Sequence, residues 1–336
     1  MSNIYNASRR ASATLIGIVI YMAGFFKLMD PVGTSLIVED YSKFFALPFI
    51  AYTAKPVAVT LSIFETLLGA ALITGVWRRI TAFASGIVLA AFTVVTAILA
   101  IKNPSMDCGC FGQAIHLTHI QSLIKNGILL LLWCYAFLPF RDFGQTKKIK
   151  YITFSIAGLS SVIFAIYSLY SVPLMDFTSY NGGAEIQTED APLSICTAQR
   201  EYIDTCCFEG PIMAISIYDT DNYDLAKTCA FLDLAGQEGY RTMVLISCAP
   251  DELYSDSDFC ADRRTLMSLN RSNTGATFIH NQQIIRKWSA NDLPDKEELD
   301  ELLQKNPTEE MLNHSVRNRL MVQGILLYVF AVMLLL

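Results

Sequence analysis

The sequence has few charged residues for its length. Asp, Glu, Lys and Arg make up 17% of its 336 residues, against about 25% in an average soluble domain. Hydrophobic residues account for 53%, and the mean hydropathy is +0.38. This deficit of charge excludes a simple soluble enzyme. The sequence also contains neither Gly-x-Gly-x-x-Gly nor a Walker-type loop, so neither kind of nucleotide-binding domain is expected.

The charges that are present are unevenly divided. Residues 1–170 contain 13 Lys and Arg against 6 Asp and Glu, whereas residues 171–316 contain 10 against 25. The last 20 residues add two Arg, which brings the formal net charge to −6. A basic, apolar half followed by an acidic half indicates a membrane domain and a soluble domain in one chain. Because the acidic segment would repel phosphate, we expect no nucleic-acid binding.

Long apolar stretches fill residues 1–172, the predicted membrane domain. A spanning helix needs about 20 mostly apolar residues. The stretch at 318–336 is a shorter, sixth candidate. The first stretch is too long for a signal peptide, so we expect it to stay as an anchor. The five predicted spans lie near 11–29, 56–76, 80–101, 120–138 and 151–171.

The flanking charges predict how these spans are oriented, because Lys and Arg near span ends stay cytoplasmic. They precede the first span and occupy the connections between the second and third and between the fourth and fifth. The amino terminus is then cytoplasmic, and residues 30–55, 102–119 and 173–317 are outside. One feature conflicts with this pattern: Arg317 and Arg319 lie on the outer side of the sixth candidate.

Eight of the nine cysteines fall in segments predicted to be outside, where disulfides persist. The most informative string is Cys108-Gly109-Cys110-Phe111-Gly112. Two thiols separated by one residue can form a strained, easily reduced disulfide, and the glycines permit a tight turn. We therefore predict Cys108 and Cys110 as a catalytic thiol pair, with Gly109, Phe111 and Gly112 as the supporting turn.

Two other interpretations of this string stay open. Cys108 and Cys110 could be structural, each pairing with another outer cysteine or packing as a small apolar residue. They could also bind zinc with His116 and His119, but zinc thiolates usually have two to four intervening residues. The predicted site therefore contains no metal.

Glu65 lies near the middle of the second span, where an unpaired carboxylate costs about 2.5–3.5 kcal/mol. Lys27, near the outer end of the first span, is its expected partner. Such a pair would fix the packing of two spans, and this is the interpretation we favour. A titrating Glu65 would instead relay a proton during thiol or quinone chemistry. Lys125 and Asn126 are expected to make interfacial or interhelical polar contacts.

Together these elements resemble the DoxX-like and MauE-type family of membrane proteins. The resemblance rests on residues 24–31 with their lysine, Glu65 with the nearby Leu67-Leu68-Gly69, the string at 108–112, and Lys125-Asn126. It implies a helical bundle in the bacterial cytoplasmic membrane with the cysteines facing the periplasm. It also implies a thiol-disulfide oxidoreductase that matures periplasmic proteins, under the family label of methylamine utilisation. Implied partners are a periplasmic thiol protein or a membrane electron carrier, with quinone as the only suggested cofactor.

Residues 211–305, after a linker at 173–210, alternate strands with helices. The pattern resembles the thioredoxin-like fold, particularly at 271–275 and the hairpin that follows. However, 219–222 reads Asp-Thr-Asp-Asn where the Cys-x-x-Cys motif is expected, and 274–276 lacks the proline of the usual turn. We therefore expect a binding module without thioredoxin catalysis. The predicted strands are 212–218, 242–248, 276–280 and 284–288, and the predicted helices are 223–238, 258–269 and 293–303.

Six further outer cysteines lie in this second half. They could form three structural bridges, or one of them could exchange with Cys108 or Cys110. If every outer cysteine is structural, the alternative function is a non-enzymatic assembly or docking protein. The six are Cys196, Cys206, Cys207, Cys229, Cys248 and Cys260.

Overall fold

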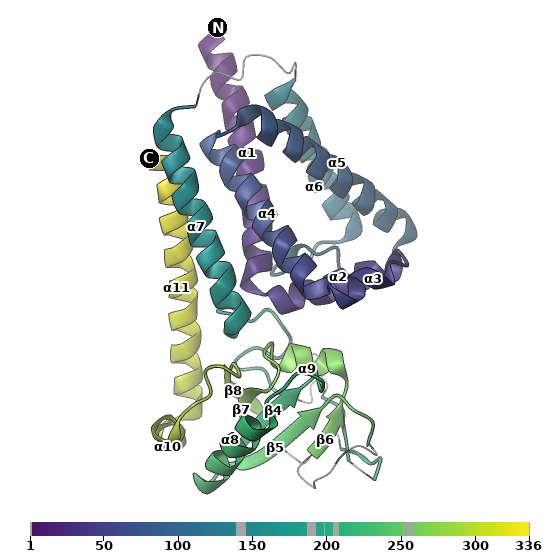
Figure 1. Cartoon of the computed structure of the whole chain (residues 1–336), viewed down its shortest axis with the longest axis vertical. Helices are drawn as coiled ribbons and strands as arrows, with labels where there is room; N and C mark the ends of the chain where they lie inside the picture. Colours follow the sequence, from purple (N-terminus) through teal and green to yellow (C-terminus); the bar gives the residue numbers. More distant parts are fainter. Residues whose placement is uncertain are drawn as a thin grey trace. The chain divides into compact units, whose positions relative to one another are not determined.

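The computed structural model describes residues 2–138, 146–186, 193–197, 199–203, 208–250, 253 and 258–335. The chain forms two compact units (Figure 1). The helical unit comprises Met1–Ile166 and Gly324–Leu336, and the α/β unit comprises Tyr167–Gln323.

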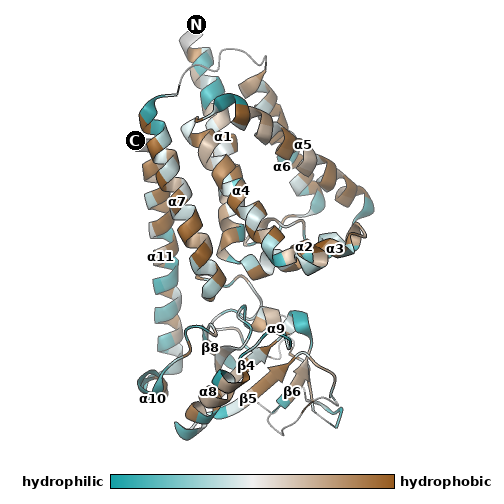
Figure 2. Cartoon of the chain, viewed as in Figure 1, coloured by the Kyte–Doolittle hydropathy of each residue, from teal (hydrophilic) through white to brown (hydrophobic). Residues whose placement is uncertain are grey.

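Six described helices are long and apolar enough to cross a membrane. Five of them overlap the predicted spans, and apolar residues recur along them in Figure 2. The sixth begins well before the predicted start at residue 318, so its first third is polar. The helices are α1 (Ser2–Met29), α4 (Ala54–Thr74), α5 (Arg78–Lys102), α6 (His119–Phe137), α7 (Lys148–Tyr170) and α11 (Pro307–Leu335).

Small residues let α1 and α4 pack closely against each other. A Cβ atom at Gly17 would lie 2.8 Å from the Cβ of Leu72, and one at Gly69 would clash with the backbone of Tyr21. Close backbone approach at glycine is a usual way for membrane helices to associate, since lipid gives them no hydrophobic drive. The packing brings the middle of α4 next to the end of α1.

Two short helices lie in the 30–55 segment, where the sequence analysis predicted only an outer connection. They are α2 (Pro31–Phe44) and α3 (Pro48–Tyr52). The side chain of Asp30 caps α2 by accepting a hydrogen bond from the Gly33 N–H at 2.8 Å. An Asp followed by Pro is a regular helix-start signal, because Pro needs no hydrogen-bond partner at the first helical position.

The α/β unit contains a seven-stranded mixed sheet in the order β3-β2-β6-β5-β4-β7-β8. Strands β4 (Pro211–Ile217), β5 (Arg241–Ile246) and β6 (Asp258–Ala261) are parallel, and α8 (Leu225–Gln237) connects the first two. Strands β7 (Gly275–His280) and β8 (Gln283–Trp288) form an antiparallel hairpin beside β4.

Alternate residues of β4 face two separate cores. Ile212 and Ala214 belong to one, and Met213 and Ile215 belong to the other. The period of two along a strand explains why one short apolar run fills both faces of the sheet. This unit therefore has an interior of its own.

One predicted helix of this unit is wrong. Residues 258–269 form strand β6 followed by α9 (Arg263–Leu269), with Asp262 capping the helix, so Cys260 lies in a strand. The predicted linker at 173–210 contains β2 (Ile195–Cys196) and β3 (Tyr202–Ile203), which extend the sheet beyond β6. Strands of two to four residues are too short to show a periodic pattern. The last predicted helix is α10 (Lys296–Gln304).

Candidate functional site

Cys108 and Cys110 lie in a tight turn between α5 and α6, at the start of β1 (Cys110–Gln113). Gly109 and Gly112 both have left-handed backbone angles, with φ of +61° and +60°. The Gly112 N–H donates to the Gly109 carbonyl at 3.2 Å. The turn places the two sulfur atoms 3.8 Å apart. A modest side-chain movement would bring them to the bonding distance of about 2.05 Å.

Helix α2 covers the turn. The Tyr41 hydroxyl donates to the Cys108 carbonyl oxygen at 2.7 Å, and Ile37 packs against Gly109. Cys108 is only 4% exposed, whereas Cys110 is half-buried. Of the two residues, Cys110 is therefore the more exposed.

A Gly109→Ala substitution is expected to destabilise the turn. The added Cβ would clash with Cγ2 of Ile37, and the positive φ would cost about 1–3 kcal/mol for any residue other than glycine. Gly127→Ala in α6 is the control, since no neighbour lies within 4 Å of its Cβ. Thermal unfolding of the purified full-length protein measures both. Equal midpoints for the two variants would show that the turn is not constrained.

Lys27 and Glu65 meet inside the helical unit. The Lys27 ammonium lies 2.7 Å from each Glu65 carboxylate oxygen, and the two side chains are 6% and 1% exposed. Lys27 also lies over the Phe92 ring, 5.6 Å from its centroid. The structure thus brings together the two intramembrane charges that the sequence singled out, and their bond joins α1 to α4.

Helix α6 contributes a second cation and a hydroxyl beside the thiols. The helix begins at a capping box between Thr118 and Gln121, which fixes its first turn. Lys125 lies over the Phe111 ring at 4.7 Å. Ser122 is fully buried, and its hydroxyl has no hydrogen-bond partner among the described residues.

Asn126 lies one position further along α6. Its amide donates to the Thr96 hydroxyl of α5 at 3.2 Å, so this residue makes the interhelical contact expected of it. Asn126 is itself buried. The contact fixes α6 against α5 beside the thiol turn.

A cavity of about 320 Å³ connects the thiol turn with the ion pair. Its walls are mostly apolar and come from α1, α2, α4, α5 and α6. Such a volume lies at the lower end of the range for small-molecule sites, about 300–1,000 Å³. Its polar lining includes Lys27, Tyr41, Glu65, Cys108, Cys110 and Lys125.

The contact between the two thiols shifts their pKa values in opposite directions. The hydrogen bond from Cys108, with further help from the Lys125 ammonium, lowers the pKa of Cys110 to about 5 against the opposing effect of burial. The same hydrogen bond, together with burial, raises the pKa of Cys108 well above its ordinary value. Burial and the neighbouring thiols also raise the pKa of Tyr41, which therefore stays a hydrogen-bond donor. Both shifts favour a thiolate on Cys110 over one on Cys108.

The structure gives no support to the zinc alternative. His116 Nδ1 lies 3.0 Å from Asp107, and His119 Nε2 lies 3.1 Å from the Pro104 carbonyl oxygen. In the described ranges, no three His, Cys, Asp or Glu residues group closely enough to hold a metal ion.

The other cysteines lie on other elements. Cys134 is in α6, Cys229 is exposed on α8, and Cys196 of β2 sits opposite Cys260 of β6 in an antiparallel pair. Cys248 lies just beyond the end of β5 at Ile246, and its carbonyl contacts the Cys260 sulfur. The adjacent pair at 206–207 falls outside the described residues.

Residues 5–139 match the family model described as methylamine utilisation protein MauE. The matched stretch includes α1 to α6 and every residue of the site. The membrane domain belongs to the MauE family. The protein is therefore a multi-pass membrane protein, as predicted. Its α/β domain lies outside the matched residues. Neither the curated proteins nor the solved structures contain a match to the chain.

Sequence reasoning missed two parts of the MauE-type site. Tyr41 comes from a helix that was not predicted, although Asp30-Pro31 marks its start. Ser122 lies three residues before Lys125 and four before Asn126, so all three share a face of α6. That spacing could have identified Ser122 as part of the same polar cluster.

Proposed function

We propose that this MauE-family protein is a membrane thiol-disulfide oxidoreductase that acts through Cys108 and Cys110. The observation that carries the proposal is the pair of sulfur atoms 3.8 Å apart at the wall of a cavity that also contains two lysines. A thiolate is the reactive form of cysteine, and nearby cations favour it. In the family context, its substrates are the thiols and disulfides of periplasmic proteins undergoing maturation.

The exchange takes two steps. The Cys110 thiolate attacks one sulfur of a client disulfide, whose S–S bond breaks while the other client sulfur leaves and takes up a proton. Cys108 then loses its proton and attacks Cys110, which breaks the mixed disulfide and releases the client as a dithiol. The client gains two electrons and two protons, and Cys108 and Cys110 are oxidised to a disulfide. The reverse sequence oxidises a client dithiol.

The polar neighbours assist the first of these steps. The Lys125 ammonium stabilises the Cys110 thiolate, and the unpartnered Ser122 hydroxyl is available to donate to it. Tyr41 holds the Cys108 carbonyl, and with it the turn. The ion pair of Lys27 and Glu65 positions α1 and α4 around the cavity.

In the direction that oxidises a client dithiol, a quinone fits the cavity as the two-electron carrier that would reoxidise the thiol pair to its disulfide. The walls suit an apolar ring, and Lys27 and Lys125 are the cationic donors able to hold its carbonyl oxygens. When bound, such a group supplies an acceptor for two electrons and two protons. In support of this proposal, the thiols and both lysines line the same cavity.

For the α/β unit we propose a thioredoxin-like module that positions the client without reacting with it. In support, β4, α8 and β5 form a parallel β-α-β unit flanked by the β7–β8 hairpin. Asp219, not a cysteine, follows β4, and its N–H donates to Asn273 at 3.0 Å. The position where thioredoxins react is therefore occupied by a capped, acidic turn.

A redox titration with thiol trapping tests the proposed function. Membranes containing the full-length protein are equilibrated in graded dithiol–disulfide buffers, quenched in acid and labelled with a maleimide reagent. We expect Cys108 and Cys110 to become reactive together in one two-electron step. If neither changes state between strongly reducing and mildly oxidising buffers, the redox function is wrong.

That negative result would support the second candidate function, a non-enzymatic assembly or docking protein. The observation in its favour is the absence of a Cys-x-x-Cys motif after β4. The α/β unit would then be the functional part, and the cysteines would serve structure alone.

A further inference from the structure

The α/β unit brings two cysteines together at one edge of its sheet. Strand β2 pairs with β6 in antiparallel register, so that Cys196 lies directly opposite Cys260. The Cα atoms of directly opposite residues in antiparallel strands are about 4.5–5.5 Å apart. Disulfides join residues whose Cα atoms are about 4.4–6.8 Å apart, so this register position suits a bond between the two side chains.

Both side chains lie on the same face of the sheet. The neighbouring pair, Ile195 and Ala261, belongs to one hydrophobic core together with Phe259. Because successive residues of a strand point to opposite faces, Cys196 and Cys260 both point to the face away from that core. The two thiols are therefore matched in register and in direction.

In the thiol form, each sulfur contacts a backbone carbonyl oxygen. The Cys196 sulfur lies 3.4 Å from the Thr197 oxygen, and the Cys260 sulfur contacts the Cys248 oxygen. Since a thiol is a weak hydrogen-bond donor, turning either side chain toward the other gives up little stabilisation. Cys196 is 5% exposed and Cys260 is half-buried, so an external reagent reaches the pair through Cys260.

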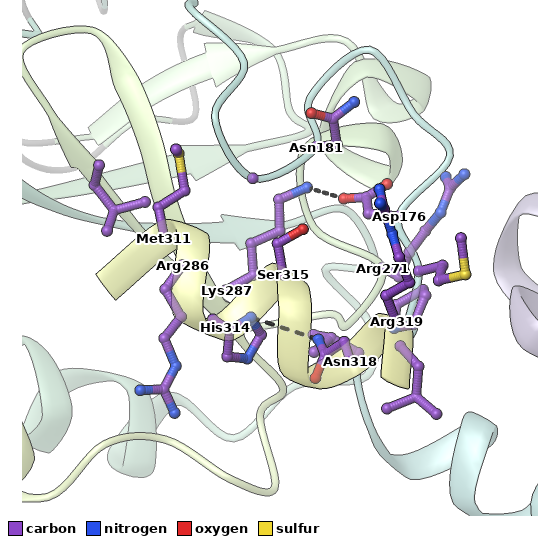
Figure 3. A pocket seen from close by; sticks show the side chains of 16 residues that line it. Asp176, Asn181, Arg271, Arg286, Lys287, Met311, His314, Ser315, Asn318 and Arg319 are labelled. Atoms are coloured by element: carbon purple, nitrogen blue, oxygen red, sulfur yellow. Dashed lines mark hydrogen bonds and ion pairs between the residues drawn. The ribbon is translucent and has the colours of Figure 1, made fainter. Parts of the chain in front are cut away.

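Few backbone pairs hold this edge of the sheet. Strand β2 meets β6 through two residue pairs and β3 through two more. The opposite edge strand, β8, is six residues long, and its Lys287 is bound by Asp176 at 2.5 Å (Figure 3). A strand of two residues needs a further link to keep its place.

We propose that Cys196 and Cys260 form a disulfide that fixes β2, and β3 beside it, to the rest of the sheet. The bond closes a loop of about 65 residues, and closing a long loop restricts the unfolded chain strongly. Cys248 is not the partner, because Cys260 pairs with Ile246 on β5 and meets the carbonyl oxygen of Cys248, not its sulfur.

A small-molecule or protein disulfide supplies the oxidising equivalents. The Cys260 thiolate attacks one sulfur of this oxidant, whose S–S bond breaks while the other sulfur leaves and takes up a proton. Cys196 then loses its proton and attacks Cys260, which releases the second sulfur as a thiol. Two electrons and two protons thus pass from the pair to the oxidant. The proposal does not depend on the redox function of Cys108 and Cys110.

Peptide mapping of the full-length protein tests the pairing. Membranes are denatured in N-ethylmaleimide to block free thiols, and the protein is then digested without reduction and analysed by mass spectrometry. We expect one linked pair of peptides that contains Cys196 and Cys260 and disappears after treatment with dithiothreitol. The proposal is wrong if both residues carry the maleimide label, or if either is linked to a different cysteine.

Thermal unfolding of the full-length protein, followed by the circular dichroism of the sheet, measures the effect of the bond. Cys196→Ser and Cys260→Ser are each expected to lower the melting temperature by about 5–10 °C. Cys229→Ser, which alters an exposed cysteine of α8, is the matched control and should stay within about 2 °C of the wild type.

Reduction separates loss of the bond from damage caused by the substitutions. Dithiothreitol should lower the melting temperature of the wild type and of Cys229→Ser but leave Cys196→Ser and Cys260→Ser unchanged. If it lowers the melting temperature of Cys260→Ser as much as that of the wild type, the stabilising bond lies elsewhere and the assignment fails.

Discussion

Replacing Cys110 with Ser is expected to abolish thiol-disulfide exchange, whereas replacing Cys108 with Ser is expected to trap a mixed disulfide with the client. The pKa of Cys110 is lowered to about 5, so at pH 7 nearly all of it is thiolate, while the pKa of Cys108 is raised. Cys110 is also the more exposed of the two residues. The first attack therefore belongs to Cys110, and Cys108 resolves the intermediate.

The pH dependence of alkylation gives an independent measure of the same assignment. A Cys110 pKa of about 5 means that its reaction with iodoacetamide should rise through pH 5 and level off by about pH 7. An ordinary cysteine continues to gain reactivity until the pH passes about 8.5. In Cys108→Ala no hydrogen-bond donor remains at this position, so the midpoint should move upward.

Cys134→Ser is the matched control for both experiments, because Cys134 lies in α6 away from the cavity lining. Its exchange rate and alkylation profile should equal those of the wild type. A mixed disulfide that accumulates in Cys110→Ser but not in Cys108→Ser would reverse the two roles. If Cys134→Ser lost as much exchange activity as Cys110→Ser, the assay would not report on the turn at Cys108 and Cys110.

Much of the helical unit could be predicted from the sequence, because its apolar stretches are long and because an unpaired charge inside a span costs a large free energy. A carboxylate at the depth of Glu65 must find a cation, and Lys27 was the residue of α1 within reach. The turn at Cys108 was visible because its two glycines are needed at positive φ. In each case, replacing the required residue type would cost about 1–3 kcal/mol or more of stability.

The parts that sequence reasoning missed depend on short elements or on distant segments that meet. Strand β2 has two residues, which is too few to show alternation, and Cys260 was assigned to a helix because the cap at Asp262 was not recognised. Tyr41 reaches the thiols only because α2 folds over them. One cavity of the α/β unit is lined by residues near 176, 271 and 319, and no local sequence pattern links them.

Breaking the pair between Lys27 and Glu65 is expected to cause the largest loss of stability. Lys27→Met leaves a buried carboxylate without its partner, and removing one member of a buried ion pair costs about 3–5 kcal/mol. Lys43→Met, on the exposed face of α2, removes an equal charge and should change stability by less than about 0.5 kcal/mol. Unfolding of the purified protein in graded denaturant measures both.

The double variant Lys27→Met with Glu65→Leu separates a structural role from a functional one. Replacing both charges with apolar groups removes the unpaired carboxylate, so stability should return to near the wild-type value or above it. If thiol exchange returns with stability, the pair only holds α1 against α4 around the cavity. If the double variant is stable but inactive, Lys27 or Glu65 also takes part in the chemistry of the cavity. A single Lys27→Met as stable as Lys43→Met would contradict the buried pair itself, because a carboxylate that is 1% exposed has no solvent to replace its partner.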